Sequence, residues 1–220
     1  MKREIIQTQD GSTTILLPEW EESYHSKHGA IQEAYHVFIH SGLSLFKGKS
    51  VSILEIGFGT GLNAFITYLE AEKRKQKIDY VGVEAYPVLL EEALQMNYVS
   101  QLDATDQSEI FKAIHEFAWE EKQQVSNVFS LTKRKQFFQD INDFEQFDLI
   151  YFDAFGFRVQ PELWSIEIFK KMFTALKPGG VLVTYACRST IKRAMLDCGF
   201  VVEKLPGAPG KREMLRATKK

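Results

Sequence analysis

The 220-residue sequence has little of what marks several special classes of protein. It contains two cysteines, Cys187 and Cys198, which are too few for a framework of several disulfides and lack the paired spacing of a metal site. It has no run of about 18 apolar residues that could cross a membrane. Its first residues, Met-Lys-Arg-Glu, are not followed by the apolar segment of an export signal. We therefore expect a cytoplasmic protein with no bound metal and no membrane partner.

The sequence also lacks repeats, low-complexity tracts and linkers rich in Pro, Gly or Ser. With 45% hydrophobic and 25% charged residues, its composition is that of a folded protein with one good-sized core. The pattern of apolar residues changes near residue 50. We therefore expect an N-terminal extension over residues 1–48 and a main domain over residues 49–220.

The extension has the pattern of a β-hairpin followed by a helix. Residues 4–9 and 12–17 flank the dipeptide Asp10-Gly11, which tolerates the positive φ angles of a tight turn. Between Gly29 and Leu45, apolar residues recur with the period of a helix.

In the main domain, short apolar runs alternate with helical patterns, which indicates an α/β fold with a parallel sheet. The predicted strands are residues 51–56, 80–84, 128–132, 148–152 and 181–185. The predicted helices are residues 62–71, 89–96, 108–119, 161–176 and 190–198. Two further strands, 200–205 and 214–217, are joined by a link too short for a parallel crossover, so we expect an antiparallel hairpin at the C-terminal end.

A glycine-rich loop follows the first predicted strand of the main domain. It runs Glu55-Ile-Gly57-Phe-Gly59-Thr-Gly61 and leads into a helix, which is where open α/β sheets bind ligands. The dinucleotide pattern G-x-G-x-x-G needs a small residue at position 62, which is Leu62, so NAD is disfavoured. The alternative is that each glycine only serves a turn.

Acidic residues follow several of the predicted strands: Glu55, Glu84, Asp140 and Asp153. Four carboxylates would repel a pyrophosphate, whereas they suit a ligand with cationic centres and ribose hydroxyls. S-adenosylmethionine has a sulfonium, an amino group and a ribose, and no phosphate. We therefore predict this cofactor, with Glu84 placed to accept hydrogen bonds from the ribose diol.

At these residues the chain resembles class I S-adenosylmethionine-dependent methyltransferases, whose motif is an acidic residue followed by G-x-G-x-G. More narrowly, it resembles the MnmD-type family of methyltransferase modules that modify the wobble uridine of tRNA. The matching stretches are residues 8–13, 24–30, 36–39, 55–63, 153–155, 161–164, 184–185 and 210–215.

The resemblance implies a Rossmann-like, seven-stranded, mostly parallel sheet. It also implies methylation of 5-aminomethyl-(2-thio)uridine to 5-methylaminomethyl-(2-thio)uridine in the tRNA anticodon loop. In many bacteria the module is fused to an FAD-dependent oxidase, for which this chain is too short, so we expect a stand-alone methyltransferase. Asn63 and Tyr24 would contact the cofactor, and Asp140 would bind the adenine amino group or else be a solvated loop residue.

One stretch departs from the family pattern. After Asp-Ala-Phe the family usually has Ser-Pro-x-x-Asn-Pro-x-x-Trp, whereas residues 156–160 here are Gly-Phe-Arg-Val-Gln. The substrate contacts of this loop are therefore not carried over. Trp164 remains a candidate for stacking on a base or lining the pocket, although an aromatic residue at helical spacing with Ile168 and Met172 is more often a core residue.

Asp153 is the candidate catalytic residue. An alkyl amine is largely protonated at neutral pH, and a carboxylate beside the cofactor could take or relay its proton. A helix cap or a loop contact is the alternative role. Cys187 raises a rival mechanism, attack on a pyrimidine ring, but nothing nearby supplies an obvious base or cation that must depress its pKa, which favours a structural role.

The formal net charge of −2 hides an uneven distribution. Residues 186–220 carry nine Lys or Arg and three Asp or Glu, a charge of +6, which leaves −8 for the rest. Lys211 and Arg212 in this stretch are candidates for binding tRNA phosphates, unless the charges only form a solvated surface. Two other functions stay open: methylation of a small-molecule or protein amine, and a non-catalytic nucleic-acid-binding module.

Overall fold

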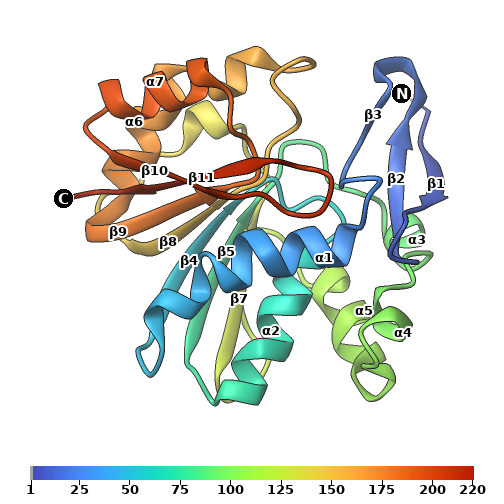
Figure 1. The fold of residues 1–220 in the computed structure, drawn as a ribbon. Coiled ribbons are helices and arrows are strands. Elements are labelled where there is room, and N and C mark those ends of the chain that lie inside the picture. Colours follow the sequence, from blue (N-terminus) through green and yellow to red (C-terminus); the bar gives the residue numbers. More distant parts are fainter. Residues whose placement is uncertain (1) are drawn as a thin grey trace.

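An eight-stranded sheet forms the centre of the protein, in a computed structural model that describes residues 2–220 (Figure 1). Its strand order is β10-β11-β9-β8-β4-β5-β7-β6. The strands are β4 (Val51–Ile56), β5 (Ile78–Val83), β6 (Lys122–Gln124), β7 (Phe129–Arg134), β8 (Phe147–Phe152), β9 (Leu176–Thr184), β10 (Val201–Pro206) and β11 (Glu213–Thr218). Strands β7, β5, β4, β8 and β9 run parallel. Helices lie in the connections between them except from β7 to β8, where a loop with a short 3-10 turn makes the crossover.

The predicted C-terminal hairpin is confirmed: β10 pairs antiparallel with β11, and β11 with β9. The α/β fold class is confirmed as well. The sheet has one strand more than the seven that the family resemblance implies, since β6 pairs antiparallel with β7 at the edge. Strand β6 consists of three polar residues, Lys-Gln-Gln, and therefore has no apolar pattern that would reveal it.

Helices cover both faces of the sheet and create two hydrophobic clusters. Helices α6 and α7 lie on one face, while α1 and α2 lie on the other (Figure 1). The helices are α1 (Ala30–Ala34), α2 (Leu62–Arg74), α3 (Leu90–Ala93), α4 (Tyr98–Gln101), α5 (Ser108–Glu116), α6 (Ile166–Ala175) and α7 (Ser189–Asp197). Within residues 2–220, no helix combines the length and the apolar character needed to span a bilayer.

Two predicted helices are interrupted. The helix predicted over 161–176 is a 3-10 turn, Pro161–Trp164, followed by α6. Ser165 separates them because its side chain accepts a hydrogen bond from the Ile168 N–H and so caps α6. The helix predicted over 29–45 begins as α1, continues as a π-helical segment, Tyr35–His40, and ends in a 3-10 turn, Leu43–Phe46.

The N-terminal hairpin is confirmed as part of a separate three-stranded sheet. Strands β1 (Glu4–Gln7) and β2 (Thr13–Leu17) pair antiparallel around the predicted turn, and β2 pairs with β3 (Glu22–Ser23). Figure 1 shows this sheet beside α3. An ion pair between Arg3 and Glu92 of α3, 2.6 Å apart, holds this sheet against α3.

Candidate active site

A cavity of about 320 Å³ lies at the carboxyl ends of the parallel strands. This size and this position are those of a small-molecule site in an open α/β sheet. The lining combines the glycine loop, the ends of β5 and β8, and the N-terminal segment: Trp20, Ser23, Tyr24, His25, Gly57, Phe58, Gly59, Leu62, Asn63, Glu84, Ala85, Tyr86, Phe137, Phe138, Gln139, Asp153, Ala154, Phe155, Gly156, Gln160, Glu162, Leu163 and Tyr185.

The glycine loop turns the chain sharply from β4 into α2. Gly57, Gly59 and Gly61 all have positive φ, of 89°, 51° and 72°. A Cβ at position 57 would lie 2.5 Å from the carbonyl oxygen of Asp153, which is too close for any side chain. The loop therefore needs glycine at this position for two reasons: its backbone conformation and its close approach to the chain that follows the neighbouring strand β8.

Glu84 lies at the pocket directly after β5, as the sequence predicts. Its carboxylate accepts two backbone hydrogen bonds of 3.0 Å, one from the Gly59 N–H and one from the Tyr86 N–H. These bonds fix its orientation and leave further acceptor positions on the same oxygens. The group can therefore receive the hydroxyls of a ribose while it holds the loop in place.

Asp153 follows β8 and also lines the pocket. Its carboxylate accepts a 2.8 Å hydrogen bond from the Asn63 side-chain amide. Burial raises the pKa of Asp153 to about 7, and the nearby Glu33 carboxylate adds to this rise, whereas Asn63 and Lys211 oppose it. An acid that titrates near neutral pH is suited to accept a proton at working pH.

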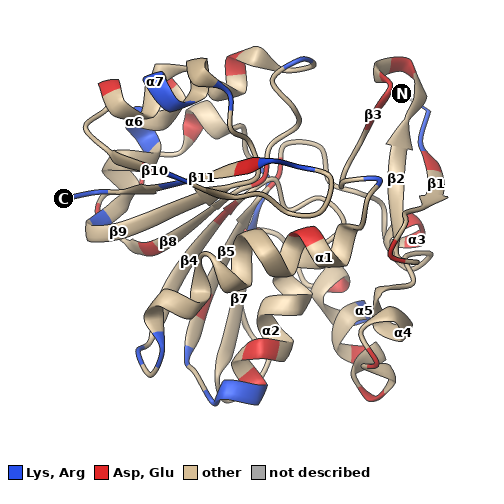
Figure 2. Ribbon diagram, viewed as in Figure 1, with Lys and Arg blue, Asp and Glu red and all other residues tan. Residues whose placement is uncertain are grey.

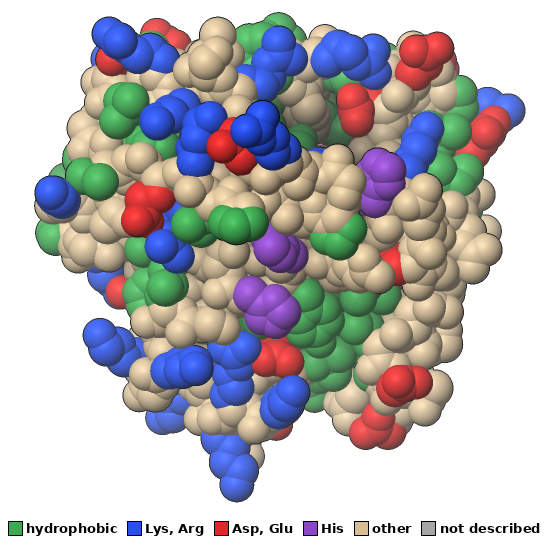
Figure 3. All heavy atoms as spheres, in the orientation of Figure 1, with side chains coloured by type: hydrophobic (Ala, Val, Ile, Leu, Met, Phe, Trp, Pro, Cys, Tyr) green, Lys and Arg blue, Asp and Glu red, His purple; other side chains and the backbone are tan. Residues whose placement is uncertain are grey.

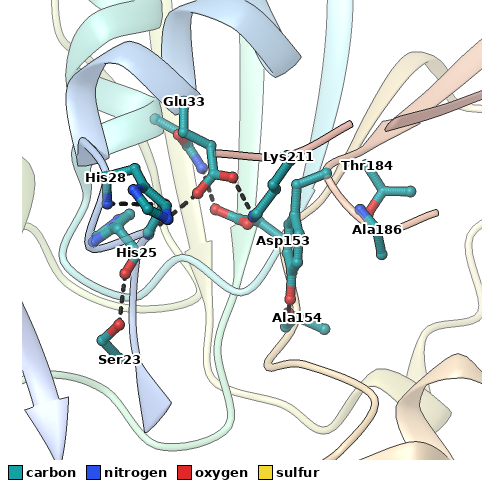
Figure 4. A network of polar contacts seen from close by, with 12 residues as sticks. Ser23, His25, His28, Glu33, Asp153, Ala154, Thr184, Ala186 and Lys211 are labelled. Carbon is teal, nitrogen blue, oxygen red and sulfur yellow. Dashed lines mark hydrogen bonds and ion pairs between the residues drawn. The ribbon is translucent and has the colours of Figure 1, made fainter. Parts of the chain in front are cut away.

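A partly buried ion pair lies beside Asp153. Lys211, in the turn before β11, contacts Glu33 of α1, and its ammonium lies 3.9 Å from the centre of the Tyr185 ring. The hydroxyl of Tyr185 donates a 2.8 Å hydrogen bond to the Ala154 carbonyl. Figure 4 shows Glu33, Lys211 and Asp153 converging from three separate parts of the chain. The sequence carries one signal of this pair, a glutamate within the buried stripe of α1, and the prediction missed it.

The structure does not place Glu55 at the cofactor pocket, where the sequence predicts it. Its side chain is 0% exposed and it does not belong to the pocket lining, because it lies within β4 and behind the loop. Burial raises its pKa well above the usual range for a carboxyl. The predicted acidic edge therefore presents Glu84 and Asp153 to the pocket, but not Glu55.

Two other predicted residues also lie elsewhere. Asp140 is exposed at the end of a 3-10 turn, Phe138–Asp140, and the neighbouring Phe137, Phe138 and Gln139 face the pocket in its place. Trp164 is 2% exposed and packs against Phe152 and Phe169 in the core. Its indole N–H is satisfied by the Phe155 carbonyl at 2.8 Å, so its role is that of a core residue.

The N-terminal segment closes one side of the pocket. The Tyr24 ring packs edge-on against Phe155, with centroids 5.0 Å apart, and burial raises the Tyr24 pKa to about 12. His25 also lines the pocket, and burial lowers its pKa to about 4 and keeps the ring neutral. Tyr24 thus lies next to Gly59, where the resemblance places a cofactor contact.

Many of the positive charges in residues 186–220 are neutralised by ion pairs. Five of the nine cations form ion pairs with acidic partners: Arg193 with Asp197, Lys204 with Glu213, Lys211 with Glu33, Arg216 with Glu203 and Lys219 with Glu145. Figures 2 and 3 show acidic residues interspersed among the basic ones, so no single-sign surface covers this face. Arg212 is exposed, whereas Lys211 belongs to the site around Asp153.

Cys187 does not line the pocket, and burial raises the pKa of its thiol, which disfavours the nucleophilic thiolate. The neighbouring Glu213 carboxylate accepts from its sulfur at 3.6 Å.

The pocket fits S-adenosylmethionine by its charge. Within the described chain, the lining holds the carboxylates Glu84, Asp153 and Glu162 and no Lys or Arg. Such a lining attracts a sulfonium and an ammonium and repels phosphates. Apolar and aromatic side chains, including Tyr86 and Phe137, provide the surface that an adenine ring needs.

The strand order and the glycine loop at the carboxyl edge define a Rossmann-like methyltransferase. A family model described as S-adenosyl-L-methionine-dependent methyltransferase matches residues 96–220. The chain belongs to this family, and its cofactor is S-adenosylmethionine.

Among curated proteins, the chain is similar to "tRNA 5-methylaminomethyl-2-thiouridine biosynthesis bifunctional protein MnmC". The protein of Acidovorax sp. (strain JS42) is 26% identical over 96% of this chain and 34% of the relative. The protein of Paracidovorax citrulli (strain AAC00-1) is 28% identical over 93% of this chain and 34% of the relative. The chain thus spans about one third of the length of these relatives.

Two solved structures show the same fold. MNMC2 from Aquifex aeolicus has a TM-score of 0.77 and 24% identity, over 100% of this chain and 71% of that one. Spermidine synthase from Thermotoga maritima has a TM-score of 0.60 and 12% identity, over 99% and 72%.

Proposed function

We propose that the protein methylates the primary amine of an aminomethyl group on the wobble uridine of tRNA. The product would be 5-methylaminomethyl-(2-thio)uridine. The observation that carries the proposal is the Asp153 carboxyl at the pocket, whose pKa of about 7 suits it to deprotonate an alkyl ammonium. The relatives named for 5-methylaminomethyl-2-thiouridine biosynthesis support this substrate.

When bound, S-adenosylmethionine supplies a methyl group activated by its sulfonium. In this proposal Glu84 holds the ribose hydroxyls, the backbone of Gly57 and Gly59 borders the cofactor, and Asn63 and Tyr24 complete its site. The aromatic side chains near Glu84 enclose the adenine. These side chains also exclude water, which strengthens the electrostatic contacts inside the pocket.

Asp153 prepares the nucleophile. An alkyl ammonium has a pKa of about 10.4 in water, and only its neutral form is nucleophilic. The ionised Asp153 carboxylate accepts one proton from the ammonium and becomes a neutral acid, which later returns the proton to solvent. Most of the remaining rate enhancement comes from holding the amine near the methyl carbon.

A second candidate, a methyltransferase for small-molecule or protein amines, is favoured by one observation. Ion pairs occupy five of the nine cations of the C-terminal stretch, which reduces the positive charge available to an RNA. In the tRNA proposal, the exposed Arg212 contributes to binding phosphates.

The test is a transfer assay with S-adenosylmethionine labelled in the methyl group. The acceptor is tRNA that carries 5-aminomethyluridine, and the matched control is the same tRNA with unmodified uridine. We expect label in the aminomethyl nucleoside alone after digestion. Folded, cofactor-binding protein that leaves this nucleoside unlabelled, or that labels a polyamine or a protein lysine instead, would refute the tRNA proposal.

A further inference from the structure

Several buried polar atoms lie together on the face of the sheet that α2 covers, and within residues 2–220 none of them forms a hydrogen bond of standard geometry. They are both carboxyl oxygens of Glu55, the side-chain oxygen of Asn63, and the hydroxyls of Tyr80 and Tyr151. Buried polar groups are nearly always paired, so such a cluster requires an explanation.

The strand register brings these side chains together. Glu55 of β4 lies directly beside Tyr151 of β8 and Gly82 of β5. Tyr80 is two residues before Gly82, and Asp153 is two residues after Tyr151. Since side chains two residues apart on a strand share a face, Glu55, Tyr80 and Tyr151 lie side by side, with Asp153 at their pocket end.

Asn63, in the first turn of α2, links the two carboxyl groups. Its amide nitrogen donates to the Asp153 carboxylate at 2.8 Å. The same side chain and the Tyr80 hydroxyl also lie next to the Glu55 carboxyl, where they oppose the rise of its pKa that burial causes. Two carboxyl groups that share one amide repel each other when both are ionised, so one of them retains a proton.

We infer that Glu55 and Asp153 act as one carboxyl pair with a single negative charge, in which Glu55 keeps the proton and Asp153 ionises. Glu55 is 0% exposed, whereas Asp153 lines the pocket, so the charge belongs on Asp153. A protonated Glu55 brings one O–H donor, and Asn63, Tyr80 and Tyr151 offer oxygens that can accept it. An ionised Glu55 would instead be a fully buried anion without a countercharge.

Glu55 is then a positioning residue that acts through Asn63 on Asp153. The other charged groups facing Asp153 are Glu33 and Lys211, which oppose each other, while Glu84 and Asp153 face Glu55 and favour its neutral form. With Glu55 neutral, Asp153 is spared a second nearby negative charge and ionises near neutral pH. The catalytic part of this inference rests on the proposed function, but the protonation of Glu55 does not.

The test uses Glu55→Gln, which preserves shape and hydrogen bonding but removes the acid. The matched control is Glu70→Gln, because Glu70 is also buried but forms an ion pair with Arg74 at 2.6 Å. Difference infrared spectra are recorded at about pH 9, where exposed carboxyls and Asp153 are ionised. We expect an acid carbonyl band in the native protein that persists in the control and is missing from Glu55→Gln.

Calorimetry with S-adenosylmethionine gives a second readout that needs no acceptor. We expect Glu55→Gln to change the cofactor Kd by less than about threefold. A Kd raised about tenfold or more, or the absence of the acid band from the native protein, would overturn the inference and make Glu55 a cofactor ligand. If Glu55→Gln does not fold, Tyr80→Phe replaces it. The band must then shift, because Glu55 loses the neighbouring hydroxyl, and an unshifted band refutes the assignment.

With the acceptor available, kcat as a function of pH tests the coupling to Asp153. In Asn63→Leu the hydrogen bond that favours ionised Asp153 is lost, so the midpoint of the acid limb should move to higher pH. In Glu55→Gln it should stay near that of the native protein. An unmoved midpoint in Asn63→Leu would contradict the positioning role, whatever the spectra show.

Discussion

The raised pKa of Asp153 implies a conflict between activity and stability that Asp153→Asn should expose. Folding moves this pKa from 3.8 to about 7. Three units at about 1.36 kcal/mol each correspond to a cost of at most about 4 kcal/mol when the carboxylate is ionised. Water in the pocket screens part of this, so we expect the neutral asparagine to stabilise the fold by about 2 kcal/mol at pH 8.

The pH dependence has a defined sign. Between pH 3.8 and about 7 the folded protein holds a proton on Asp153 that the unfolded chain has lost, so native stability falls as pH rises through this window. The advantage of Asp153→Asn therefore grows from nearly nothing at about pH 4 to its full value above about pH 7. In the transfer assay, the same variant should lose about 10²- to 10⁴-fold in kcat, because asparagine cannot accept a proton.

Urea unfolding at about pH 4.5 and pH 8 measures the effect, with Asp140→Asn as the control because Asp140 is an exposed carboxylate. The control should differ from the native protein by less than about 0.5 kcal/mol at both pH values. The reasoning fails if Asp153→Asn is no more stable than the native protein at pH 8, or if its advantage is the same at both pH values.

Three further outcomes are expected. Gly57→Ala should raise the cofactor Kd at least about tenfold in calorimetry, since a Cβ would lie 2.5 Å from the Asp153 carbonyl; unchanged binding would contradict the loop geometry. Arg212→Ala should weaken tRNA binding and flatten its salt dependence. Lys211→Ala should leave the salt dependence unchanged and move the acid limb of kcat to higher pH, because Lys211 lowers the pKa of Asp153. A flattened salt dependence in Lys211→Ala would restore its assignment to RNA binding. Trp164→Ala should lower the free energy of unfolding by about 3–5 kcal/mol, and a loss below about 1 kcal/mol would show that Trp164 is not a core anchor.

The central strands could be predicted because burial on both faces leaves a continuous apolar run. In Val51–Ile56 only Ser52 and Glu55 interrupt the apolar run, and the observed bounds of this strand are the predicted ones. Strand β6, Lys122–Gln124, could not be predicted from its own polar residues, since it forms by pairing with the edge of β7. Periodicity thus finds the elements that build the core and misses those that only attach to it.

The candidate site was predictable as far as strand order fixes it. Glu84 and Asp153 come directly after β5 and β8, so they reach the pocket. Glu55 lies one position before the end of β4, and its side chain points into the sheet face that α2 covers. Sequence spacing alone does not reveal that Glu55 is buried beneath the pocket and not exposed to it. The pairing of Glu33 with Lys211 joins residues 178 positions apart, which no local pattern records.

The loop at residues 156–160, where the sequence departs from the family pattern, contacts the N-terminal segment. Arg158 donates a 2.8 Å hydrogen bond to the Trp20 carbonyl and lies 3.5 Å from the Glu22 carboxylate. Gly156 and Gln160, on either side of it, line the pocket together with Trp20. The arginine therefore joins the loop to the N-terminal segment by a cross-link between distant parts of the chain. Arg158 stands at an unspecified position of the family pattern, whose proline and asparagine correspond to Phe157 and Gln160. Through the Arg158 contacts, the loop and the N-terminal segment form one continuous wall of the pocket.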